Sequence, residues 1–156
     1  MLIRCPHPDL SANEKTFLSA SSDANATSIT VQNTQGFVLN DYIVIGNLAT
    51  EKSEIVKINA AVTTDTLLTI TALSFGHPAG ELVTFIKYDQ VKFYMSTSET
   101  GTFALQTTVD LDVDSDYTTW DDTDGTSALW YKTSLYNSTS FLESSLSDAV
   151  QASGFK

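Results

Sequence analysis

Basic residues are scarce in this chain. Lys and Arg together number eight against nineteen Asp and Glu, so the formal net charge is −11 over 156 residues. Binding to nucleic acid or to an anionic membrane needs clustered positive charge, and this balance argues against both. The charge therefore leaves other proteins, or cations, as the expected partners.

Cysteine is also nearly absent. The single thiol, Cys5, excludes an intrachain disulfide framework, so stability must come from packing of the 42% hydrophobic residues. Cys5 lies in the segment "RCPHP", where two prolines and the lack of any periodicity predict an extended N-terminal arm over residues 1–12. We expect this arm to be disordered in the isolated protein and to become ordered only against a neighbour.

Long hydrophobic runs are missing. The first ten residues contain no apolar segment typical of a secretion signal, and no stretch approaches the roughly 18 apolar residues of a membrane span. We therefore expect the chain to be made in the cytoplasm. Two Asn-x-Thr triplets, at Asn25 and Asn137, are interpreted as loop residues rather than as glycosylation sites.

Helical periodicity is nearly absent, and period-two alternation recurs along the chain. Strand-like segments separated by Gly, Asn, Asp and Ser predict an all-β fold, either a sandwich or a barrel. The segments are residues 27–32, 41–46, 53–59, 66–72, 81–88, 90–96, 102–111 and 127–136. In the Ser-rich end, residues 141–151, the pattern favours a final strand over a helical turn.

The strand pattern divides near Tyr88 to Val91. It predicts a small β-barrel or sandwich unit over residues 13–88, a second β unit over 89–151, and a short tail over 152–156. Units of this size have limited cores, so we expect them to share an interface or to rest on neighbouring subunits.

Aspartates at alternate positions mark one acidic stretch, 110–124. An EF-hand calcium loop is excluded, because counting from Asp110 places Ser115 where a Gly is needed and Asp121 where a Glu is needed. Two interpretations remain: a looser calcium site built from loop carboxylates, or the solvent side of a strand. The second is favoured, with Val109, Leu111 and Val113 facing inward and Asp110, Asp112, Asp114 and Asp116 facing water.

No pattern in the chain indicates catalysis. His7 and His77 lie 70 residues apart and outside any ligand-spaced or Ser/His/Asp arrangement, and "FGHPAGE" around His77 is typical of a hairpin turn. Cys5 precedes a proline, which is a poor setting for a nucleophile. Without a phosphate loop or a Cys/His cluster, the sequence predicts no catalytic, cofactor-binding or metal-binding residue.

Aromatic residues gather in the second half of the chain. Exposed Trp120 or Trp130 beside carboxylates could bind a sugar, but core packing is the commoner role and is favoured here. Trp130 and Tyr131 are adjacent in a strand and must point to opposite faces.

The second half resembles the later strands of a fibronectin type III domain, with the family's first two strands missing or replaced. The matching features are an aspartate before a Gly turn, a Tyr-x-x-x-Leu-x-Asn strand, and a Glu-Ser followed by Ser near the end. They are Asp122 and Gly125; Tyr131, Leu135 and Asn137; and Glu143, Ser144 and Ser147. The resemblance implies a partial fibronectin type III or Ig-like sandwich.

The first half resembles small β modules of tailed-bacteriophage virion proteins encoded among head and neck genes. Its pattern combines a Gly-x(4)-Asp-x-Ile-x-Ile-Gly segment, a Glu-x-x-x-Ile strand and a His-x-x-Gly-Glu-x-Val close. The residues are Gly36, Asp41, Ile43, Ile45 and Gly46; Glu54 and Ile58; and His77, Gly80, Glu81 and Val83. In that family these residues serve turns and strand pairing, so the resemblance implies no catalytic role for them.

The resemblance implies a non-enzymatic virion structural protein at the head-to-tail neck or connector, or decorating the capsid. Its partners would be capsid, portal or neck subunits, and it would form a symmetric homo-oligomer in the particle. Two other functions stay open: a carbohydrate or host-surface binding module of a phage tail, and a calcium-stabilised adhesion module of a bacterial surface protein.

Overall fold

A computed structural model describes residues 1–152, and strands are the only regular secondary structure in that part of the chain. This confirms the predicted all-β class. The strands are β1 (Leu2–Pro6), β2 (Lys15–Phe17), β3 (Ser28–Thr30), β4 (Tyr42–Ile45), β5 (Glu54–Lys57), β6 (Leu67–Thr69), β7 (Leu82–Ile86), β8 (Gln90–Ser96), β9 (Ala104–Asp110), β10 (Tyr117–Asp121), β11 (Trp130–Tyr136) and β12 (Val150–Gln151). They form open sheets, so neither unit is a closed barrel within the described residues. None of these residues forms a helix that could cross a membrane.

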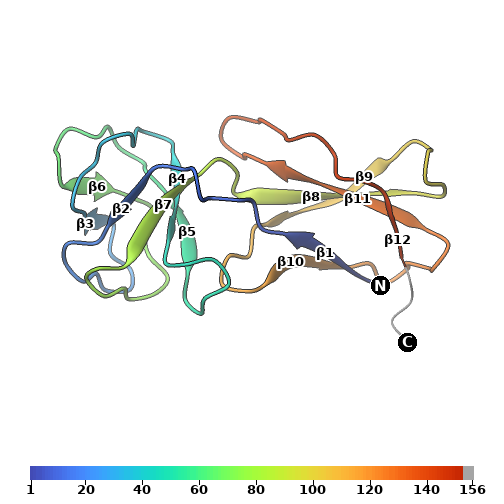
Figure 1. Ribbon diagram of the computed structural model, residues 1–156, viewed down its shortest axis with the longest axis horizontal. Helices are drawn as coiled ribbons and strands as arrows, with labels where there is room; N and C mark the ends of the chain where they lie inside the picture. The colour runs from blue at the N-terminus through green and yellow to red at the C-terminus, as the bar shows by residue number, and fades with distance from the viewer. Residues whose placement is uncertain (153–156) are drawn as a thin grey trace. The chain divides into compact units, whose positions relative to one another are not determined.

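The chain folds as two compact units (Figure 1). Among the described residues, unit 1 consists of Met1–Pro6, Tyr88–Asp112 and residues 117–152, and unit 2 consists of His7–Lys87 with Val113–Asp116. The chain therefore starts in unit 1, passes through unit 2 and returns to unit 1 at Tyr88.

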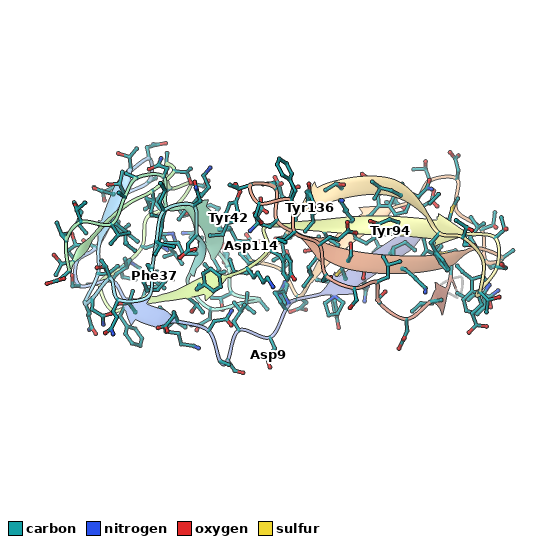
Figure 2. All side chains as sticks on the ribbon, turned by 90° about the horizontal axis from the view of Figure 1, so that it is seen from above. Asp9, Phe37, Tyr42, Tyr94, Asp114 and Tyr136 are labelled. Carbon is teal, nitrogen blue, oxygen red and sulfur yellow. The ribbon has the colours of Figure 1, made fainter. Side chains whose placement is uncertain are left out.

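Unit 2 packs a four-stranded antiparallel sheet of order β2-β7-β4-β5 with the pair β3-β6. Every residue of β4 is buried, which explains why "YIVI" is a continuous apolar run rather than an alternating one. Aliphatic side chains and one aromatic ring, that of Phe37, fill the core (Figure 2). The members with less than 2% exposure are Leu18, Ile29, Val31, Ile43, Ile45, Ile58, Leu68, Ile70, Leu73 and Val83.

Unit 1 is built from a four-stranded antiparallel sheet of order β12-β11-β8-β9 and the antiparallel pair β1-β10. Side chains of the two sheets meet in its core. The Trp120 ring of β10 lies 5.8 Å from the ring of Phe93 and 6.1 Å from that of Tyr131. Trp120 is half-buried and packs against these two buried rings, in line with the packing role that the sequence favoured for it.

The prediction of a disordered arm over residues 1–12 is wrong for its first half. Leu2–Pro6 form β1, which pairs with β10 from Leu2 opposite Asp121 to Pro6 opposite Tyr117. The strand forms because Ile3 and Cys5 present apolar side chains on one face, and Cys5 is buried. The remainder of the expected arm, from His7, belongs to unit 2.

The C-terminal segment forms far less strand than predicted for 141–151. Only Val150–Gln151 pair as a strand, with Tyr131 and Trp130 of β11. Leu142, Leu146 and Val150 stay exposed and so supply no buried face. A segment without a buried face has little to fix it as a regular strand.

The acidic stretch is only partly a strand. Leu111 and Val113 are buried and Val109 is half-buried, while Asp110, Asp112 and Asp116 are exposed. Asp114 is half-buried, and β9 ends at Asp110, so residues 111–116 form a connection rather than a strand. The inward and outward pattern is as predicted, whereas the continuous strand is not.

Cys5 gives a direct test of how β1 is placed. Burial raises the pKa of its thiol, against a smaller lowering by a hydrogen bond with Thr133, so the reactive thiolate is disfavoured. We expect a water-soluble thiol reagent to label Cys5 of the native protein at least about 100-fold more slowly than that of the denatured protein, since labelling needs local opening. Equal rates would mean that residues 1–6 are a free arm after all.

Candidate interaction site

The two edges of the four-stranded sheet of unit 1 differ in how their backbone groups are hydrogen-bonded. On one side, β11 is covered by the segment that follows it: Ser144 N donates to Leu135 O at 2.9 Å and Ser147 N to Thr133 O at 2.8 Å. The hydroxyls of the same two serines accept from Leu135 N and Thr133 N, each at 2.9 Å. With β12 beyond them, these serines satisfy the backbone of that edge.

The other edge of the sheet is β9, seven residues with the sequence ALQTTVD. Its inner neighbour is β8, and no other strand of residues 1–152 pairs with it (Figure 1). The strand contains no Lys and no Pro, the residues that usually guard an edge against pairing with another chain. Its side chains are exposed or half-buried throughout, and Leu105 is 49% exposed. We call this outer side of residues 104–110 the β9 edge.

Hydrogen bonding at the end of β9 shows which backbone groups point outward. Leu111 N donates to Asp89 O at 2.8 Å, in register with the pairing of Val109 with Val91. Because antiparallel pairs alternate between bonded and non-bonded, Thr107 and Val109 direct their N–H and C=O groups toward β8. Thr108 and Asp110 therefore direct theirs away from β8, along the β9 edge. Gln106 is the extra residue of a bulge opposite Phe93 and Tyr94.

A charged cluster fastens the segment after β11 to the outer face of the same sheet. Glu143 accepts from Lys92 Nζ at 3.0 Å, from Ser134 Oγ at 2.6 Å and from the Tyr94 hydroxyl. The Lys92 ammonium also lies 3.8 Å from the ring centroid of Tyr136, and Figure 2 labels both tyrosines. These contacts join β8, β11 and the C-terminal segment into one surface.

The pKa of Glu143 lies below its ordinary value of 4.5. Partial burial acts to raise this pKa, but hydrogen bonds from Ser134, Tyr94 and Lys92 together lower it by more. The stability contributed by ionised Glu143 is thus present above the ordinary pKa and is lost as the pH falls through the lower, folded-state pKa.

We therefore expect Glu143→Gln to lower the melting temperature at pH 7, and the gap from the unaltered protein to shrink as the pH falls below 4.5. Thermal melts followed by circular dichroism between neutral and acidic pH measure this. Glu99→Gln is the matched control, because Glu99 is exposed. A gap that stayed constant down to the acid limit would contradict a stabilising role for the ionised carboxylate.

An apolar tip lies in the loop after β11. Phe141 is 75% exposed and Leu142 is 54% exposed. Phe141 also has a φ of 61°, a left-handed conformation that costs a residue with a Cβ about 1 kcal/mol. Ser138 at the base of the loop bonds both oxygens of Asp89, at 2.8 and 2.5 Å. The loop is thus anchored while its apolar tip faces solvent.

A groove of about 480 Å³ on unit 1 is lined by β1, β11 and residues 147–152. Leu2 and Val150 expose apolar surface there, and Arg4 and Lys132 contribute positive charge beside Asp148. This lining combines apolar surface with charge of both signs.

Unit 2 contains a buried cluster of one histidine and two glutamates that the sequence reasoning missed. His77 Nε2 lies 2.9 Å from Glu54 Oε1, and His77 Nδ1 lies 3.0 Å from Glu81 Oε2. The exposed fractions of the side chains are 1% for His77 and 9% for Glu54. Glu54 also accepts from Ser74 N at 2.9 Å and Phe75 N at 3.0 Å. The cluster joins β5 to the segment before β7, which is a structural role.

The sequence predicts His77 to be a turn residue, and the turn is only part of its environment. Its backbone exchanges two hydrogen bonds of 2.8 Å with Ser22, which fixes a bridge outside the named strands. The four-residue spacing to Glu81 was a signal that could have suggested one of the contacts. Nothing local pointed to Glu54, which lies 23 residues before His77 in the chain.

Within residues 1–152, no group of three or more His, Cys, Asp or Glu side chains is arranged to hold a metal ion. The aspartates of the acidic stretch do not gather around one point. Asp110 ends β9 and accepts from Gln90 Nε2 at 3.0 Å, whereas Asp116 is exposed next to β10. Both tryptophans are half-buried: Trp120 on β10 packs against Phe93 and Tyr131, and Trp130 lies on β11.

We expect millimolar calcium to leave the melting temperature unchanged, because these carboxylates face solvent separately. Differential scanning calorimetry with calcium, and with magnesium as the control, measures this. A calcium-specific rise of more than about 5 °C, roughly a kcal/mol for a domain of this size, would overturn the surface interpretation.

Other residues of the sequence motifs form turns or hydrogen bonds within each unit. The Tyr131 hydroxyl donates to Asp122 Oδ2 at 2.7 Å, and partial burial followed by this bond raises the pKa of the phenol. In unit 2, Asp41 accepts from Val38 N at 2.9 Å in the turn before β4, and Gly46 ends β4 with a φ of 100°. A Cβ at Gly46 would lie 2.4 Å from Ser53 Oγ, so the position requires glycine.

Comparison with known proteins gives no relative: no family model, no curated protein and no solved structure matches this chain.

Proposed function

We propose that this chain is a non-enzymatic structural protein of a tailed-bacteriophage particle. It would lie at the head-to-tail neck or connector, or on the capsid surface, and hold neighbouring subunits through its exposed strand edge. Its partners would be capsid, portal or neck subunits, and its final location the virion.

The β9 edge is the observation that carries this proposal. A seven-residue edge strand without Lys or Pro is guarded only by the bulge at Gln106 and by Asp110, so it can still pair with an exposed strand of another chain. In an assembly the same edge supplies hydrogen bonds to a neighbour. The contrast with the β11 side, which Ser144 and Ser147 close, indicates that the chain has the means to cover an edge and leaves this one open.

The charge and the exposed apolar tip support the same proposal. A net charge of −11 keeps free copies apart until a neutral or basic surface receives them. Phe141 and Leu142 are large apolar side chains held at the surface by an anchored loop, and such side chains are typical of contact positions. The resemblance of the first half to virion β modules supports a particle as the setting in which both features would contact neighbouring subunits.

The carbohydrate-binding alternative is less well supported. It needs an exposed tryptophan beside carboxylates, and Trp120 packs against Phe93 and Tyr131 instead. Both tryptophans are half-buried, so neither presents a fully exposed ring for that role.

Purified particles of the phage that encodes the chain test the proposal. We expect mass spectrometry to find the polypeptide in intact particles and cryo-electron microscopy to place it at a symmetric ring or shell position. Particles made without it should lose stability or infectivity. Equally stable and infectious particles lacking the polypeptide would count decisively against a structural role, and glycan binding by the isolated protein would favour the alternative.

A further inference from the structure

We propose that an extended segment of a neighbouring particle subunit adds as a strand to the outer edge of β1 and fills the groove beside it. The segment carries apolar side chains at alternate positions toward the groove and basic side chains on the side that faces solvent. The inference deepens the proposed function, on which it rests for the source of the segment, by naming a second contact on unit 1 and the chemistry of its partner.

The two sheets of unit 1 differ in width. The sheet β12-β11-β8-β9 has four strands, whereas the sheet that packs on it has two among residues 1–152, β1 and β10. Trp120 of β10 packs against Phe93 of β8 and Tyr131 of β11. Cys5 of β1 bonds to Thr133 of β11. The narrow sheet therefore lies over β8 and β11, and the groove lies beyond β1, next to β12.

The groove runs along the edge of a strand. Its lining includes the consecutive residues 1–4, although successive side chains of a strand point to opposite faces. A groove that touches consecutive residues therefore follows the edge of β1, and residues 150–152 line its other wall in the same way. Its volume of about 480 Å³ lies within the range of about 300–1,000 Å³ that is typical of binding pockets. The shape and the size suit an added strand.

Hydrogen bonding at the start of β1 shows which backbone groups face outward. Met1 N donates to Asp122 O at 2.7 Å, and Asp122 N donates to Met1 O at 2.8 Å. Bonded and non-bonded pairs alternate along an antiparallel ladder, so Leu2, opposite Asp121, directs its N–H and C=O groups away from β10. Leu2 therefore offers a donor and an acceptor to an added strand. Pro6 has no N–H, which limits the pairing to the Leu2 end of β1.

The apolar side chains of the groove indicate what the segment must present to it. Leu2 is 42% exposed and Val150 is 65% exposed, and both line the groove together with the half-buried Ile3. Apolar side chains at every second position of the segment would remove this surface from water. The positions between them would face solvent, beside a chain of net charge −11, and this charge favours basic residues there.

The charged residues of the lining favour the same partner. The Arg4 guanidinium lies 5.5 Å from the ring centroid of Tyr117, and Lys132 Nζ lies 4.7 Å from that of Phe103. Neither ring lines the groove, so both cations are turned toward rings outside it. Asp148 lines the groove and is exposed, and its carboxylate can pair with a basic residue of the segment.

Two synthetic peptides of equal composition test the site in solution. One alternates valine and lysine along its length, and the other carries the same residues in two blocks. The alternating peptide should bind the purified chain at least about 10-fold more tightly, because only it can pair with β1 and place its valines together in the groove. Fluorescence anisotropy at an ionic strength of about 0.15 M measures both affinities, with long-range charge attraction screened.

A proline at position 2 tests the backbone pairing. Leu2→Pro removes the outward N–H, and the bonds between Met1 and Asp122 do not use that group. This variant should bind the alternating peptide about 10-fold more weakly than Leu2→Ala, which keeps the N–H. Equal melting temperatures of the two variants show that β1 is intact in both.

A charge in the groove supplies a measurement that does not depend on the proline variant folding. Val150→Lys should weaken binding of the alternating peptide at least about 10-fold, because it replaces apolar lining by a charge that repels the peptide. Val38→Lys is the matched control, since Val38 is 59% exposed and lies in unit 2. It adds the same charge away from the groove and should leave binding unchanged.

Cross-linking in purified particles tests the source of the segment. A photoreactive benzoylphenylalanine in place of Val150 should cross-link to a segment of another particle subunit, identified by mass spectrometry. The same group in place of the exposed Thr63 of unit 2 should not cross-link to that segment.

The proposal is overturned if the two peptides bind equally, or if neither Leu2→Pro nor Val150→Lys weakens binding. Particles that contain the chain without cross-links from position 150 would also reject it, and would leave the structural function standing. Selective peptide binding with no chain in particles would do the reverse: the strand-addition site would stand and the proposed function would fall.

Discussion

Replacing His77 with leucine is expected to destabilise unit 2 by on the order of 3–5 kcal/mol, because removing the imidazole from the buried cluster leaves a carboxylate charge without its side-chain partner. Glu54 is the charge in question, since its side chain is 9% exposed. Glu54 keeps its two hydrogen bonds from Ser74 N and Phe75 N, so we expect a loss of stability toward the lower end of that range. At roughly 4–8 °C per kcal/mol, the melting temperature of unit 2 should fall by more than about 10 °C.

A double-mutant cycle separates the charge from the packing. Glu81→Leu and His77→Leu together should cost less than the sum of the two single changes, because each alone leaves a partner unsatisfied. Glu51→Leu is the control at an exposed carboxylate. Urea unfolding of the four proteins gives the coupling free energy. A His77→Leu protein as stable as the unaltered one would show that the cluster contributes nothing to folding.

Deleting Met1–Pro6 is expected to unfold unit 1. The deletion removes one strand of the β1-β10 pair, and with it the buried Cys5 side chain. A two-stranded pair that loses one strand cannot persist, so β10 should lose its structure as well. The tryptophan fluorescence and near-ultraviolet circular dichroism of unit 1 should collapse, while unit 2 keeps its own unfolding transition.

Single substitutions in β1 distinguish the effect of losing the strand from the effect of shortening the chain. Ile3→Asp places a charge toward the core and should reproduce most of the deletion's effect. Leu2→Asp is the control, because Leu2 is 42% exposed and points the other way. If the shortened protein kept its fluorescence and its melting temperature, residues 1–6 would have to be regarded as the free arm that the sequence suggested.

The sequence by itself determined the all-β class and most strand positions. Alternation is a property of neighbouring residues, and it located the strands from β3 to β9 and β11 to within a few residues. It also determined the inward and outward assignment around Leu111 and Val113. Local spacing was sufficient because the side-chain period of a strand is two whatever strand lies beside it.

Pairing over long distances was decided only by the tertiary structure. β1 and β10 are more than a hundred residues apart, and each segment looked irregular alone, one because of its prolines and the other because of its aspartates. They become strands because Ile3 and Cys5 on one, and Thr118 and Trp120 on the other, present apolar or buried side chains to a shared core. No local pattern contains that complementarity.

The candidate site divides in the same way. The sequence of β9 predicted that it is a strand. Its position at the edge of the sheet, with Thr108 and Asp110 directed outward, depended on which strands took the other positions. His77 shows the same dependence, since Glu54 reaches it only after β4, β5 and β7 have paired. Strand order depends on which distant segments pair. The total burial and hydrogen bonding of the folded sheet decide between the possible orders, and neither is a property of any local segment.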